Sequence, residues 1–142
     1  MKAKSIKGKS TEEVQSALTK CMANGFRPTL AICFISKNQD RKAISALLDA
    51  EGISIFGCTT NGEFIDEQTK KGSAAILLLE MNKDYFTVYF EEYPDKNYRE
   101  IAQGIARRAA KKFSKPAFLL GLSDASVDGE EILCGLEDVV GA

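Results

Sequence analysis

The chain has 142 residues, a formal net charge of −1, 44% hydrophobic residues and 27% charged residues. This composition is typical of one soluble globular domain, and the balanced charge argues against nucleic acid or a membrane as a partner. The absence of histidine excludes a Ser-His-Asp or Cys-His catalytic centre and a histidine-based zinc site within this sequence. We therefore expect no metal and no cofactor.

The amino-terminal residues are rich in lysine and are not followed by the apolar segment of a signal peptide. We predict that this basic arm is solvated and frayed. No apolar run approaches the roughly 20 residues that a membrane-spanning helix needs, so we expect a cytoplasmic protein. The four cysteines lie far apart in different predicted elements, which favours reduced thiols that mostly fill the core.

The first predicted helix begins at a capping box, Ser10–Glu13, because a hydroxyl residue is followed three positions later by a glutamate. Apolar residues at helical spacing continue to about Ala23, and the Asn-Gly pair after it ends the helix. Residues 30–35 are then continuously apolar, which predicts a strand that is covered on both faces.

A second helix and further strands follow this first strand. Asp40 is suited to cap the helix, which closes at Gly52, and residues 53–56 are a short apolar strand. Strand, helix and strand at this spacing predict a βαβ unit. Residues 74–79 and 85–90 are two more strand candidates with a short polar connection, which predicts an antiparallel hairpin.

The last part of the sequence predicts a helix, a strand and a helix. The first of these helices begins at Asn97 and has Ile101 on its apolar face, residues 117–122 form the strand, and Asp128 begins the last helix. With the preceding elements, these patterns predict an α/β fold of one domain, in which a mixed sheet has flanking helices. The βαβ unit is followed by the antiparallel hairpin and then by an αβα segment.

The segment from Gly57 to Glu63 is a candidate ligand site, because it contains a thiol, two hydroxyls, an amide and a carboxylate beside two glycines. It leaves the strand 53–56 at its carboxyl end, where ligands gather in open α/β sheets. Its glycine spacing matches neither a Walker A loop nor a dinucleotide fingerprint. An ordinary turn, whose threonines hydrogen-bond the main chain, remains an alternative interpretation.

A second polar loop, at Ser123 and Asp124, leaves the predicted strand 117–122 at its carboxyl end. If the two strands are neighbours, the two loops converge on one rim of the sheet. The candidate ligand-binding residues are Gly57, Cys58, Thr59, Thr60, Asn61, Gly62, Glu63, Ser123 and Asp124.

These residues also resemble a known family. The matching residues are Gly57, Cys58, Thr59, Thr60, Gly62, Glu63, Asp128, Gly129, Gly135, Leu136 and Gly141. They resemble the amino-terminal part of the FIST domain, a sensory module of bacterial signalling proteins. The resemblance implies a small-molecule sensor, with amino acids or their derivatives as ligands, that acts on a signalling output domain or protein partner. Asn61 departs from the small residue usual in the turn, and the chain ends before the carboxyl-terminal half that the family normally has, which implies an incomplete FIST N domain.

Three functions remain open from the sequence. The first is a module that binds an amino-acid-like ligand through Thr59, Thr60 and Asn61. The second is a protein-interaction module or homodimer that uses the strand 85–90 or an open sheet edge. The third is a thiol enzyme with Cys58 as its nucleophile, which the lack of a histidine base disfavours, so we expect no enzymatic activity.

Overall fold

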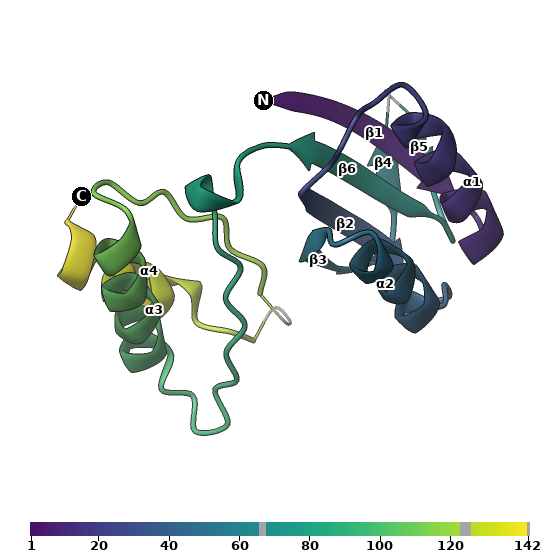
Figure 1. Ribbon diagram of the computed structural model, residues 1–142. Coiled ribbons are helices and arrows are strands. Elements are labelled where there is room, and N and C mark those ends of the chain that lie inside the picture. The colour runs from purple at the N-terminus through teal and green to yellow at the C-terminus, as the bar shows by residue number, and fades with distance from the viewer. Residues whose placement is uncertain (66–67, 123–125, 142) are drawn as a thin grey trace. The chain divides into compact units, whose positions relative to one another are not determined.

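The computed structural model describes residues 1–65, 68–122 and 126–141, and for residues 63–65 and 68–70 it describes the main chain alone. The chain forms two compact units, Met1–Val88 and Tyr89–Ala142. The first unit contains a mixed four-stranded sheet with helices on one face, and the second contains a pair of helices (Figure 1). The α/β class and the mixed sheet predicted from the sequence are confirmed.

The sheet of the first unit has the strand order β1-β6-β2-β3. The strands are β1 (Lys2–Gly8), β2 (Leu30–Ser36), β3 (Ser54–Thr60) and β6 (Ala74–Glu80). β2 and β3 are parallel and are joined by α2 (Arg41–Ala50), which confirms the βαβ unit. β6 lies antiparallel between β1 and β2, and a short separate hairpin pairs β4 (Glu63–Ile65) with β5 (Gln68–Lys70).

The core of the first unit lies between one face of the sheet and the helices α1 (Thr11–Met22) and α2. Alternate residues of β2 point to this face and are buried, namely Ala31, Cys33 and Ile35. Aliphatic side chains of the two helices meet them there, and burial of each such side chain contributes about 1.5–3 kcal/mol. We expected cover on both faces of β2, but Phe34 on the other face is 41% exposed, because both helices pack on the same side.

The amino-terminal arm is not frayed, which corrects the prediction from its lysines. It forms β1, paired antiparallel with β6 along its whole length. The Lys2 ammonium lies 3.2 Å from the Glu80 carboxylate. Lys4 donates to the carbonyl of Cys21 at 3.1 Å, and its ammonium lies 4.9 Å from the centre of the Phe26 ring. The long-range pairing with β6 therefore orders a segment that has no strong local signal for a strand.

The predicted hairpin between residues 74–79 and 85–90 is wrong in its second strand. Residues 83–85 form a short 3₁₀ helix instead, which Asn82 caps by accepting from the amide of Asp84, and residues 86–90 are not in a strand. The reason is the sheet order: β6 is hydrogen-bonded to β1 on one side and to β2 on the other. Neither edge of β6 is left for the segment that follows it in sequence.

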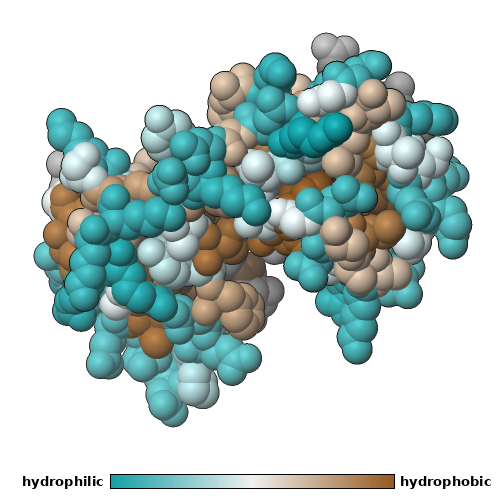
Figure 2. Space-filling view, viewed as in Figure 1, coloured by the Kyte–Doolittle hydropathy of each residue, from teal (hydrophilic) through white to brown (hydrophobic). Residues whose placement is uncertain are grey.

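The second unit is built on α3 (Tyr98–Lys112) and α4 (Gly129–Val140), and their buried contact combines the small residues Ala102 and Ala106 with Leu136. Ala102 and Ala106 are buried, whereas Ile101, which we predicted on the apolar face of this helix, is only half-buried. The opposite side of α3 is polar, and Figure 2 shows hydrophilic side chains over this helix. Its basic residue Arg108 pairs with Glu91 and lies over the Tyr89 ring.

The predicted strand at residues 117–122 is also wrong. This segment is neither helix nor strand, and only Phe118 in it packs against the α3–α4 core, while Leu119 is 64% exposed. A strand needs a partner for its main-chain groups, and the described part of the second unit contains no strand that pairs with it. The segment thus has the composition of a strand, but no strand in the described part of the second unit pairs with it.

The helix caps agree well with the sequence. Ser10, Asp40 and Asp128 each accept a hydrogen bond from a main-chain amide in the first turn of the helix that follows. Asn97 precedes α3 as predicted, but its side chain makes no capping bond. Its side-chain oxygen Oδ1 is buried and has no hydrogen-bond partner among the described residues.

Candidate functional site

The candidate site lies at the carboxyl end of β3, and its first half is not a turn. We predicted that the chain leaves the strand after Phe56, but β3 continues to Thr60 and is paired with β2 along its full length. Only Asn61 and Gly62 form the bend that leads into β4. Ligands of open α/β sheets bind beside the carboxyl ends of parallel strands, and the end of β3 lies beside the end of β2 at Ser36.

Gly57 has a packing role within the sheet. A Cβ atom at this position would lie 2.0 Å from the carbonyl oxygen of Cys33 on β2, a distance that no side chain tolerates. Gly62 differs, because a Cβ there would have nothing within 4 Å. The two glycines that bracket the segment therefore do different things: the first allows two strands to approach closely, and the second lies in open space.

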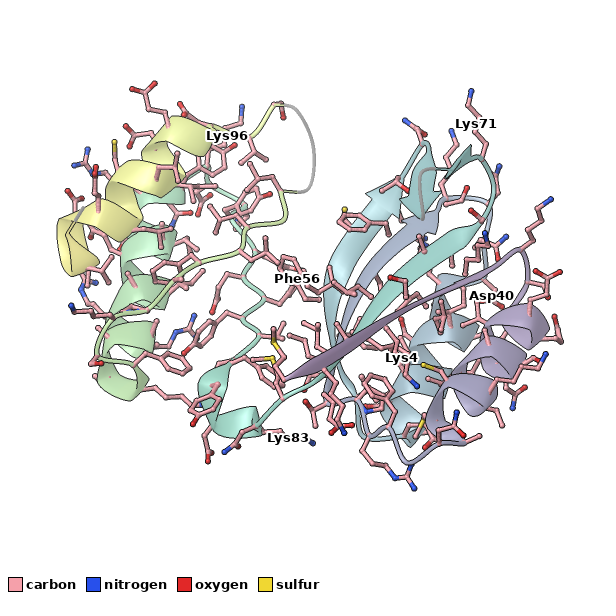
Figure 3. All side chains as sticks on the ribbon, turned by 90° about the horizontal axis from the view of Figure 1, so that it is seen from above. Lys4, Asp40, Phe56, Lys71, Lys83 and Lys96 are labelled. Carbon is pink, nitrogen blue, oxygen red and sulfur yellow. The ribbon has the colours of Figure 1, made fainter. Side chains whose placement is uncertain are left out.

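The polar side chains of the segment do not all share one side of the sheet, since successive strand residues point to opposite faces. Cys58 and Thr60 lie on the open face, opposite Phe34 and Ser36 of β2. Thr59 lies on the face that carries the helices. Figure 3 shows Phe56, which shares the open face with Cys58, on the side of the sheet away from α1 and α2.

Exposure separates the candidate residues further. Cys58, Thr59, Asn61 and Gly62 are exposed, and Thr60 is half-buried. Within the described part of the chain, the side chains of Thr59 and Asn61 form no hydrogen bond. Their hydroxyl and amide groups are therefore accessible to a ligand.

Three predicted site residues have no described side-chain position. Glu63 is the first residue of β4, and the structure describes its main chain alone. Ser123 and Asp124 lie outside the described residues. Their convergence with the end of β3 stays a prediction.

The loop that follows β2 reaches the same edge, and it was not among the predicted site residues. Ser36 is 5% exposed, its amide donates to the carbonyl of Ser73 at 2.9 Å, and its hydroxyl accepts from the amide of Asn38 at 3.4 Å. The amide of the Gln39 side chain donates to the carbonyls of Lys9 and Gly72, both at 2.8 Å. This loop is thus held in place beside Thr60. The polar run directly after the apolar residues 30–35 was the signal that indicated it.

The two cysteines of the sheet, Cys33 and Cys58, differ in burial. Burial raises the pKa of the Cys33 thiol to about 12, so this cysteine is protonated at neutral pH. Cys58 is exposed, and no described residue forms a hydrogen bond with its thiol. Among the described side chains, no three of His, Cys, Asp or Glu gather closely enough to hold a metal ion.

Comparisons with known proteins agree with the resemblance seen in the sequence. The family model of the FIST N domain matches residues 29–142, from the residue before β2 to the end of the chain. No curated protein and no solved structure matches the chain. In the described part, none of the helices is long and apolar enough to cross a membrane. The match covers most of the sequence and includes β3 and both helices of the second unit, so the chain belongs to the FIST family, a family of sensory signal-transduction domains, through its FIST N domain.

Proposed function

We propose that this FIST N domain binds a small polar molecule, an amino acid or a derivative of one, at the carboxyl ends of β2 and β3. The observation that carries the proposal is the accessible polar end of β3 beside a parallel strand, with Thr59 and Asn61 exposed. Open α/β sheets hold ligands at such an edge, because the loops that leave neighbouring parallel strands diverge there.

The two faces of the sheet give the residues different roles. We assign polar groups of the ligand to two residues: Thr60, on the open face beside the ordered loop after Ser36, and Asn61, in the bend that follows β3. The hydroxyl of Thr59 lies on the helix-covered face, so it can bind the ligand only if the ligand extends around the end of the strand. We assign the cationic group of the ligand to the carboxylate of Glu63, the first residue of β4, since opposite charges attract at close range.

We also propose binding without catalysis. The sequence has no histidine to act as a base for Cys58, and a thiol without such a base or a nearby cation is a weak nucleophile at neutral pH. Alkylation of Cys58 with iodoacetamide at the rate of a free thiol is the expected result. Alkylation several hundred times faster would support the thiol enzyme.

The context of the binding event follows from the family. We propose that the domain acts in the cytoplasm and passes its ligand-bound state to a signalling output domain or protein partner, with no part for nucleic acid or a membrane. The formal net charge of −1 supports this choice, because it provides no strong field for an anionic partner.

The test is a thermal-shift screen of the whole chain against the amino acids and their common derivatives, followed by calorimetry. We expect at least one compound to raise the melting temperature and Asn61→Ala to reduce the affinity about tenfold, as loss of one to two hydrogen bonds does. Asn24→Ala is the matched control, an exposed amide after α1 at the opposite end of the sheet, and should bind normally. Equal affinity of the two variants for the ligand would show that the ligand does not bind at this edge of the sheet.

A further inference from the structure

The two edges of the sheet in the first unit differ in charge. β1, at one edge, carries Lys2, Lys4 and Lys7. Lysines on an edge strand discourage pairing with another chain. β3, at the other edge, has the sequence SIFGCTT, without a charge or a proline. The lysines of β1 therefore disfavour pairing with another chain at that edge, whereas β3 has no such protection.

The main-chain groups on the outer side of β3 can be identified. The amide of Ser54 donates to the carbonyl of Thr29, which leads into β2, at 3.0 Å. Because main-chain groups alternate in direction along a strand, those of Ile55, Gly57 and Thr59 point away from β2. Within the described residues, β2 is the only strand hydrogen-bonded to β3, so these outward groups lack a strand partner.

The outer side of β3 is also complementary to itself. In an antiparallel pair with a two-fold axis at Gly57, each Gly57 would exchange two main-chain hydrogen bonds with the Gly57 of the second copy. Ile55 would pair in the same way with Thr59 of the second copy. Phe56 would lie opposite Cys58 of the second copy on the open face, so an apolar contact would form and no charges would meet.

We propose that two copies of this chain associate through β3, antiparallel about Gly57, so that their sheets form one continuous sheet. The second copy is the occupant because the same seven residues supply both sides of the contact, with every outward amide and carbonyl of one copy facing its counterpart in the other. The proposal concerns assembly and does not depend on the ligand. It also leaves Asn61 and Gly62 just beyond the paired segment.

The first test uses the outward direction of the Thr59 amide. Thr59→Pro removes a donor that faces only the second copy, and proline is accepted in edge strands at such positions. Thr59→Val keeps the amide and the shape of the side chain. By analytical ultracentrifugation, we expect dimers for the unmodified chain and for Thr59→Val, and at least a tenfold weaker dimer for Thr59→Pro. A monomeric unmodified chain, or an equally tight Thr59→Pro dimer, overturns the proposal.

The second test remains informative if Thr59→Pro fails to fold. Phe56→Cys places a thiol opposite Cys58 of the second copy, in a non-hydrogen-bonded pair where Cα atoms lie about 4.5 Å apart, within reach of a disulfide. Under mild oxidation we expect most of this variant to form covalent dimers whose linked peptides contain positions 56 and 58. Lys7→Cys on β1 is the control and should form few. Equal cross-linking of the two variants would contradict self-association. Protection of the Thr59 amide from hydrogen exchange in a monomer, by another protein or segment, would also contradict it.

Discussion

The two compact units differ in how closely their packed elements approach each other. In the first, large aliphatic side chains such as Ile44, Leu48 and Leu78 fill the space between sheet and helices and are completely buried. In the second, α3 and α4 approach each other where Ala102 and Gly135 leave almost no side chain between them. The first unit thus depends on large side chains that fill the space between sheet and helices. The second depends on small residues that let its two helices approach closely. Loss of side-chain volume should therefore destabilise the first unit, and gain of side-chain volume at the helix contact should destabilise the second.

The largest expected effect is the loss of volume in the first unit. Leu48→Ala removes a fully buried side chain and leaves a cavity between α2 and the sheet, so it should lower the free energy of unfolding by about 2–5 kcal/mol. Urea denaturation followed by circular dichroism measures the change. Leu133→Ala, at a side chain that is 59% exposed on α4, is the control and should change the stability by less than about 1 kcal/mol. Similar losses for both would contradict the burial of Leu48 in the core of the first unit.

The next effect comes from a glycine that the sheet requires. Gly57→Ala forces a Cβ against the Cys33 carbonyl oxygen, which must move by more than an ordinary side-chain adjustment, and should destabilise the protein by about 1–3 kcal/mol. Gly62→Ala adds its methyl group to open space and should be close to neutral. Thermal melting of the two variants compares them directly. An unchanged melting temperature for Gly57→Ala would mean that β3 does not pair with β2 at this position.

Gain of volume in the second unit should have a comparable effect. At Gly135 a Cβ would lie 2.4 Å from the Arg99 carbonyl oxygen and 2.8 Å from Cβ of Ala102, so Gly135→Ala should separate the helices and destabilise this unit by about 1–3 kcal/mol. Gly104→Ala, in the same helix pair but with nothing within 4 Å, should instead stabilise α3 by about 0.5–1 kcal/mol. Chemical denaturation should show opposite signs. The same sign for both changes would argue against the close helix contact.

The smallest effect concerns an ion pair at the surface of the second unit. Arg99 donates to both carboxylate oxygens of Asp138, at 2.8 and 2.9 Å, and the Gln103 amide donates at 2.8 Å, which together lower the pKa of Asp138 to about 2. A lowered pKa in the folded state adds stability above the unfolded pKa, near 3.9. This stability should disappear between about pH 4 and pH 2. Asp138→Asn should remove this part of the pH dependence of the melting temperature, while Glu137→Gln, beside it and exposed, should keep it.

The sequence predicted the elements that are decided locally. The capping residues Ser10, Asp40 and Asp128 were predicted because a cap depends on three or four neighbouring residues. The βαβ unit was predicted because its apolar strands and amphipathic helix are adjacent in sequence. The strand predicted at residues 85–90 is absent because β1, a segment distant in sequence, already occupies the edge of β6.

The candidate site was predicted in part, for a related reason. Asn61 and Gly62 do form the bend at the strand end, whereas Gly57 to Thr60 have the composition of a turn and form a strand because the backbone of β2 offers them an edge. Main-chain hydrogen bonding is independent of side-chain type, so composition alone could not reveal where β3 ends. Ser36 was overlooked because its importance depends on the parallel register with Thr60.

The most direct test of the central claim, a ligand site at the carboxyl ends of β2 and β3, is an NMR titration of the whole chain with the best compound from the thermal-shift screen. The account predicts that the largest amide shifts occur at residues 36–39 and 58–62, with small shifts in α1. Saturable shifts that are largest elsewhere, or no saturable shift with any compound of the screen, would contradict it.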